Sequence, residues 1–151
     1  MKRNSRLSSV LHVILHMAER DAPMTSEELA LHMHTNPVVV RRTMAGLRDA
    51  GFVRSEKGHG GGWVIAKDLA TLTLRDIYNA LGSPELFALG NRTENPACLV
   101  EQSVNHALDV AFLEAEALII ERLATVSLAD LAADFHRRFE AFKQENKSHD
   151  L

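Results

Sequence analysis

Apolar residues recur at the three-to-four residue spacing of an α-helix near the start of the chain. The repeat covers residues 7–18 and consists of Leu7, Val10, Leu11, Ile14, Leu15 and Ala18. Polar residues occupy the opposite side, among them His12 and His16. This pattern predicts an amphipathic helix with one buried face. The sequence Asp-Ala-Pro at residues 21–23 ends it.

Two short helices are predicted next. Thr25 and Glu28 have the spacing of a capping box, and the helix that follows is expected to bury Leu29, Ala30 and Met33. His34 and Thr35 form a tight connection. Asn36 and Pro37 then supply an N-cap and a proline at the first helical position.

The second of these helices has an anchored face and an outward face. Val40, Met44 and Leu47 form the apolar stripe, and Gly51 provides a C-terminal stop. The residues expected elsewhere on the helix are Arg41, Arg42, Ala45 and Arg48.

A β-hairpin follows the helices. Residues 52–57 and 63–66 are short β-prone runs on either side of a glycine-rich turn. Thr73 then caps another helix, whose apolar stripe is Leu74, Ile77, Tyr78 and Leu81.

The last third is predicted to contain two helices. A long amphipathic helix covers about residues 99–124, through Val104, Leu108, Ala111, Leu118 and Leu123. Ser127 caps a closing helix that is expected to reach about Phe142.

The order of elements predicts a mainly α fold with a small β-hairpin wing, which is a winged helix-turn-helix domain joined to a long dimerisation helix. We place the DNA-binding domain at residues 1–82 and a connector and sensing loop at 83–98. The dimerisation helix and closing helix occupy 99–142, and a polar tail occupies 143–151.

Charge is distributed unevenly although the net charge is only −3. Residues 1–68 hold ten Lys/Arg and seven Asp/Glu, whereas residues 69–151 hold seven and thirteen. A basic first half suits a polyanion such as DNA. The apolar runs are too short to cross a bilayer, and the basic N-terminus lacks the apolar stretch of a secretory signal, so we expect no membrane association and a cytoplasmic protein.

The predicted reading helix carries groups suited to DNA. Arg41 and Arg42 offer guanidinium groups to guanine or phosphate, and Asn36 offers an amide to bases. Val38 and Val39 in the first turn can pack on thymine methyl groups. Further contacts with DNA are expected from the cap and wing residues Thr25, Ser26, Lys57 and His59.

Four segments resemble the Rrf2 family of transcriptional regulators. RTMAGLRDAGFVRS (residues 42–55) is similar to the family's reading helix and first wing strand, and KGHGGGW (57–63) to its wing. LTLRDI (72–77) and SLADL (127–131) resemble its next helix start and closing segment. The resemblance covers roughly residues 5–135. It implies a dimer that binds double-stranded DNA, with contacts from Asn36, Val38, Val39, Arg41 and Lys57.

Several family members hold an iron–sulfur cluster with three closely spaced cysteines before the dimer helix. This chain has one cysteine, Cys98, whereas a cluster needs about four ligands, mostly thiolates. We therefore predict no cofactor. Cys98 at a helix start is a candidate thiol sensor, although a structural or idle cysteine is the favoured interpretation.

Eight histidines raise the question of a metal site. His12 and His16 lie four residues apart and share a helix face, as two ligands do, and His32 and His34 are also close. Neither pair has an obvious third ligand nearby in the sequence. The prediction is that no metal is bound.

Catalysis is not expected. HGGG at residues 59–62 matches an oxyanion-hole run of some esterases, but the chain has no G-x-S-x-G nucleophile elbow and no P-loop lysine. The favoured function is a homodimeric regulator, a repressor on a pseudo-palindromic operator, that responds to thiol chemistry or to an unidentified ligand. The alternatives are a winged helix that binds only protein, and a sensor with a mixed-ligand metal or iron–sulfur site.

Overall fold

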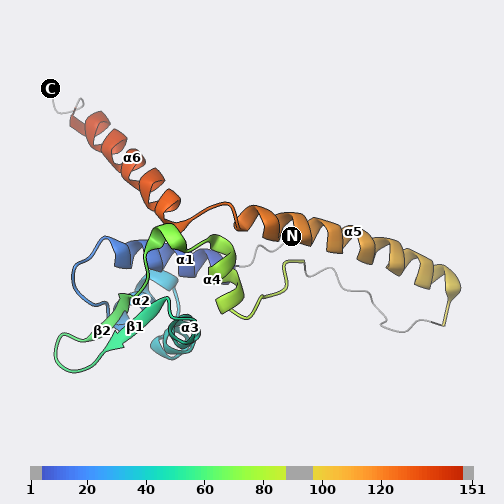
Figure 1. The fold of residues 1–151 in the computed structure, drawn as a ribbon, viewed down its shortest axis with the longest axis horizontal. Coiled ribbons are helices and arrows are strands. Elements are labelled where there is room, and N and C mark those ends of the chain that lie inside the picture. The colour runs from blue at the N-terminus through green and yellow to red at the C-terminus, as the bar shows by residue number, and fades with distance from the viewer. Residues whose placement is uncertain (1–4, 88–96, 148–151) are drawn as a thin grey trace.

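The computed structural model describes residues 5–87 and 97–147, and the middle of the predicted connector lies outside these ranges. Six α-helices and a two-stranded antiparallel hairpin make up the described residues, which confirms the predicted fold class. Most of the elements form a head, from which α5 (Leu99–Leu123) and α6 (Leu128–Lys147) project in different directions (Figure 1). Within these ranges, no helix is long and apolar enough to span a membrane.

The first helix, α1 (Ser5–Ala18), packs through a face slightly different from the predicted one. Val10 and Ile14 are buried as expected, but Val13 and Met17 also belong to the core, whereas Ala18 is exposed. Because α1 contacts α2, α4, α6 and the hairpin, its buried face is wider than one stripe.

The predicted helix-turn-helix consists of α2 (Ser26–Met33) and α3 (Pro37–Asp49). Thr25 forms the capping box with Glu28, and the turn between the helices is possible because His34 adopts a left-handed conformation with φ of 52°. Val40, Met44 and Leu47 are completely buried, as predicted, and anchor α3 to the core. Met33 is only partly buried.

The hairpin pairs β1 (Val53–Glu56) with β2 (Gly62–Ile65). A short bridge extends it, since the backbones of Met24 and Trp63 exchange two hydrogen bonds of 3.0 and 2.8 Å. The wing is thereby attached to the segment that leads into α2.

We expect Gly62→Ala to lower the free energy of unfolding by at least about 3 kcal/mol. A Cβ at Gly62 would lie 2.5 Å from the carbonyl oxygen of Met24, and the backbone φ of 154° disfavours any side chain. Gly60→Ala is the matched control, because its Cβ meets nothing within 4 Å and only its φ of 75° is unfavourable, which costs about 1 kcal/mol. Urea unfolding of both variants at one protein concentration tests this, and equal losses would contradict it.

A short 3-10 helix, η1 (Leu69–Thr71), and α4 (Leu74–Ala80) complete the head. Ile77, Tyr78 and Leu81 are buried as predicted. The joint between α5 and α6 returns to this point: Leu74 N donates to Val126 O at 3.0 Å, and Leu128 N donates to Leu72 O at 2.8 Å. The long helices are therefore fixed to the head by a backbone bridge.

Two features of the last helices differ from the predictions. The apolar residues of α5 are spread around the helix and do not gather on one face. The closing helix continues to Lys147, beyond the predicted end near Phe142, since its last turns contain helix-forming residues and an ion pair of 3.0 Å between Lys143 and Glu140.

Candidate nucleic-acid interface

The first turn of α3 presents its side chains to solvent. Val38 and Val39 are 59% and 40% exposed; Val38 lies opposite the buried anchor residues, and Val39 lies on one flank of the helix. Asn36 caps the helix, and its Oδ1 accepts a 3.0 Å hydrogen bond from Val39 N. The side-chain carbonyl of Asn36 is thus engaged within the protein, which leaves its amide NH2 group as the donor for a base.

Arg41 and Arg42 extend this exposed surface along α3. Arg41 Nη1 lies 3.5 Å from Glu27 Oε1 on α2, and both side chains are more than half exposed. Exposed ion pairs contribute only about 0–1 kcal/mol, so a phosphate can replace the Glu27 carboxylate at little cost.

The wing places two further predicted residues at its tip. Lys57 and His59 are exposed in the turn between β1 and β2. Gly58 and Gly60 have φ values of 92° and 75°, and Gly61 N donates to Gly58 O at 3.0 Å. Since glycine carries no side chain, the backbone of this turn can approach a duplex closely.

Thr25 and Ser26 both have roles within the fold: Thr25 forms the predicted capping box, whereas the sequence did not reveal the role of Ser26. The Thr25 hydroxyl exchanges hydrogen bonds with Glu28, whose pKa is lowered by the Thr25 backbone amide first and also by Arg20. Ser26 Oγ accepts a 3.1 Å hydrogen bond from Trp63 Nε1, which joins α2 to the wing. Both hydroxyls thus have partners inside the protein, and their contact with phosphate remains a prediction.

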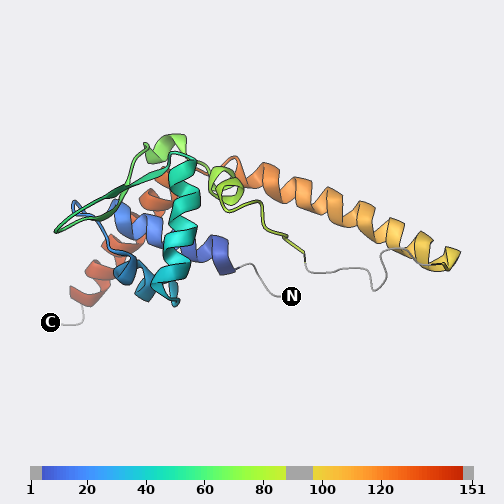
Figure 2. The ribbon, with the colours of Figure 1, turned by 90° about the horizontal axis from the view of Figure 1, so that it is seen from below.

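The reading helix and the wing lie on one side of the head. In Figure 1, α3 and the turn of the hairpin lie on the side away from α6, and the view from below in Figure 2 shows α3 nearest the viewer. The nine predicted DNA-binding residues come from the start of α2, from α3 and from the wing tip, and all are exposed or partly exposed.

An apolar surface of a different kind covers α5. None of its residues is buried, and its large exposed apolar residues are Leu99, Val100, Val104, Leu108, Val110, Leu113, Leu118 and Ile119. So many exposed apolar residues on one helix mark a candidate protein–protein interface, although they lie around the helix and not on a single face.

Cys98 is exposed at the N-cap of α5. The backbone amides of Glu101 and Val100 lower the pKa of its thiol, with Glu101 the larger influence. Most of the predicted sensing loop before it, residues 88–96, lies outside the described residues.

Because the thiolate is the reactive form, we expect Cys98 to be alkylated by iodoacetamide at neutral pH at least about twofold faster in the folded chain than in urea. The pH midpoint of the reaction should also be lower in the folded chain. Mass spectrometry of the modified protein measures both, with Cys98→Ser as the unreactive control. An equal or higher midpoint in the folded chain would contradict the prediction.

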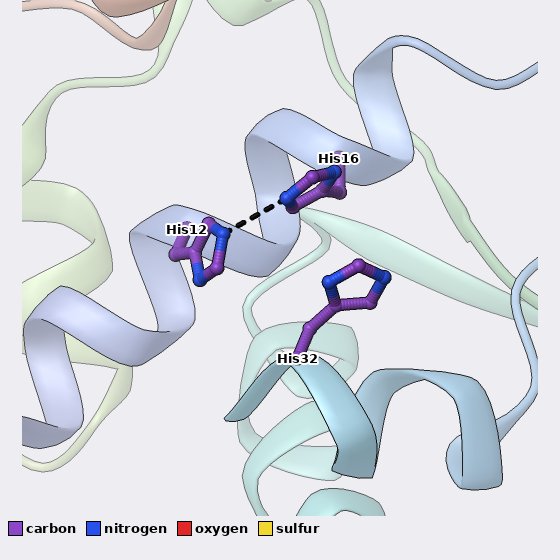
Figure 3. Close-up of side chains that lie close together, drawn as sticks. All are labelled: His12, His16 and His32. Atoms are coloured by element: carbon purple, nitrogen blue, oxygen red, sulfur yellow. Dashed lines mark hydrogen bonds between the residues drawn. The ribbon is translucent and has the colours of Figure 1, made fainter. Parts of the chain in front are cut away.

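Three histidines that the sequence left in two separate pairs lie together in space (Figure 3). His12 and His16 on α1 have their Nε2 atoms 2.8 Å apart, and His32 of α2 stacks against His16 with ring centroids 4.2 Å apart. The pKa of His16 is lowered, mainly by burial and then by His32 and His12. His32 is therefore a third potential ligand beside His12 and His16. The sequence predicted no metal because it showed no third ligand, and only the packing of α1 on α2 brings His32 to the pair.

The comparisons with known proteins agree on the family. The Rrf2 profile, described as an iron-dependent transcriptional regulator, matches residues 3–134. YwnA of Bacillus subtilis, whose name describes it provisionally as an HTH-type transcriptional regulator, is 36% identical to this chain over 129 residues. The match covers 85% of this chain and 95% of YwnA.

Solved structures show the same fold. A transcriptional regulator from Lactobacillus plantarum, assigned provisionally in its name, superposes with a TM-score of 0.71 at 25% identity, over 94% of this chain and 97% of that one. CymR, the global cysteine regulator of Bacillus subtilis, has a TM-score of 0.61 at 21% identity, over 88% and 97% of the two chains. The latter likeness concerns the fold alone.

The family description names iron. This chain has too few cysteines to hold iron as a cysteine-ligated cluster. Such a cluster takes about four ligands, mostly thiolates, and the sequence supplies the single thiol of Cys98. The helix-turn-helix, the wing and the agreement of profile and relatives do not depend on a cluster. The chain belongs to the Rrf2 family of transcriptional regulators and is not an enzyme.

Proposed function

We propose that this regulator is a repressor that binds a pseudo-palindromic operator as a homodimer, in the cytoplasm. The observation that carries the proposal is the exposed first turn of α3, where Val38, Val39 and Arg41 are open to solvent, on the same side of the head as the wing. Apolar contacts with thymine methyl groups and guanidinium contacts with guanine or phosphate are the means by which a reading helix selects sequence.

The dimer is supported by the apolar surface of α5. Eight large apolar side chains on one helix are exposed in the single chain, and burying them against a second copy removes that surface from water. Glu114, Glu116, Glu121 and Arg122 would then lie at the rim of the interface. An operator that is an inverted repeat with half-sites on successive turns of DNA would require the two reading helices of this dimer to lie roughly 34 Å apart.

The first test is selection of bound sequences from a random DNA library, followed by affinity measurements on the selected site at several salt concentrations. We expect an inverted repeat and an affinity that falls steeply as salt rises, because phosphate contacts release counterions. Failure to select any sequence would favour the alternative, a winged helix that binds only protein.

The effector is proposed to act near Cys98 and the connector, by changing the relative placement of the two heads. Operator binding measured before and after mild oxidation, in the parent and in Cys98→Ser, tests the thiol version. If both respond equally, Cys98 is not the sensor and a small ligand becomes the better candidate.

A further inference from the structure

The histidine cluster, made of His12, His16 and His32, brings three imidazoles from two helices to one point (Figure 3). One potential ligand nitrogen from each residue lies within 4.8 Å of the other two. His12 is exposed and the other two are partly buried, so the nitrogens are reachable from solvent. Neither the DNA interface nor the surface of α5 uses these residues.

The spacing of the nitrogens is close to that of a tetrahedral metal site. Zinc–nitrogen bonds of about 2.0–2.1 Å place two tetrahedral ligands about 3.3 Å apart. The two Nε2 atoms of His12 and His16 are 2.8 Å apart, and all the separations in the cluster are within 4.8 Å. Adjustments of about 0.5–1.5 Å, within reach of imidazole side-chain rotation, bring all three onto one ion.

The surroundings provide for a fourth ligand and for charge. A pocket of about 170 Å³ opens beside the cluster and is lined by His12, Leu15, His16, Glu19 and Phe135. This volume holds water, which is the usual fourth ligand of a three-histidine zinc site. The Glu19 carboxylate, itself 2.9 Å from His136 Nε2, adds negative charge at the border of the pocket and favours a cation there.

We propose that His12, His16 and His32 bind one divalent transition-metal ion, Zn²⁺, with water as the fourth ligand. Three imidazole nitrogens suit zinc and its first-row neighbours, whereas magnesium and calcium prefer oxygen. The ion joins α1 to α2, which is followed by the His34 turn and the reading helix. Binding at this site requires neither DNA nor a second chain, so it stands apart from the proposed operator binding.

The test is a titration of the full chain with Zn²⁺, after a chelator has removed any bound metal. Isothermal calorimetry measures the binding. We expect one ion per chain in the parent and at least about tenfold weaker binding in His12→Ala and in His32→Ala, because each variant lacks a direct ligand. His34→Asn is the matched control: His34 is two residues from the cluster, exposed and left-handed, a conformation that asparagine tolerates. Cys98→Ser is the second control and should bind as the parent does.

Cobalt gives a second measurement that reports the ligands directly. The Co²⁺-loaded chain should show the visible bands of a tetrahedral ion without a thiolate charge-transfer band, and the bands should be absent in His32→Ala. Zn²⁺ should raise the Tm of the parent and of His34→Asn but not that of His12→Ala, whose exposed position makes the substitution mild. Equal Zn²⁺ affinity in His32→Ala and the parent, a thiolate band, abolished binding in Cys98→Ser, or no binding at all would overturn the proposal.

Discussion

Replacing Arg41 and Lys57 by alanine together is expected to weaken specific operator binding about 1000-fold. The double variant removes four cations from the proposed DNA surface of the proposed homodimer, and each is worth about 1 kcal/mol or more. The effect at Arg41 has a second part, since its removal leaves the Glu27 carboxylate, now 3.5 Å from the guanidinium, facing DNA phosphates without a partner cation.

Fluorescence anisotropy with the selected operator at several salt concentrations measures this effect. The slope of log affinity against log salt should fall by up to about four, since each phosphate that is no longer neutralised lowers the slope by about one unit. Arg137→Ala on α6, an exposed arginine paired with Asp134, is the control and should retain the parent affinity. Unchanged affinity in the double variant would show that the DNA surface lies elsewhere.

The second large effect is expected on the association of two chains into the proposed dimer. Leu108→Glu combined with Leu118→Glu should weaken the dimer about 1000-fold, because four carboxylates enter an apolar interface where each costs at least about 1 kcal/mol. The two side chains are 43% and 67% exposed in the single chain, so the variant should fold normally. Sedimentation from nanomolar to micromolar concentrations measures the change.

Leu31→Glu on α2 is the matched control for assembly. Leu31 is 78% exposed and lies on the head, outside the proposed interface, so this variant should remain a dimer. If the α5 variant also remains a dimer at nanomolar concentration, the chains associate through another surface. The exposed phenylalanines of α6, Phe135, Phe139 and Phe142, would then be the next to examine.

Local signals in the sequence predicted the helix-turn-helix well. Thr25, Asn36 and Thr73 cap helices as expected, and the anchor of α3 at Val40, Met44 and Leu47 is fully buried. Each of these features depends on residues within one or two turns of one another. Such features can be read from spacing alone.

Features that depend on contacts between distant segments were not predictable. The use of the Ser26 hydroxyl by Trp63 needs the bridge between Met24 and Trp63, and the meeting of His32 with His16 needs α1 to pack on α2. Helical spacing predicts a single apolar stripe on α5, because a helix usually buries one face. The spread of the apolar residues around the helix permits contacts on more than one side, as with Phe112, whose ring lies 5.9 Å from that of Phe87.

The backbone bridge between Thr73 and Ser127 holds one end of the long helix α5 against the head. With 25 residues, α5 is about 37 Å long, so a tilt of one degree at the bridge moves its far end by about 0.6 Å. Conversely, a movement of the far end of α5 tilts the helix at the bridge. In the proposed dimer, a displacement of a few ångströms at the start of α5 would correspond to a rotation of several degrees at the bridge, and so to a change in the spacing of the two reading helices.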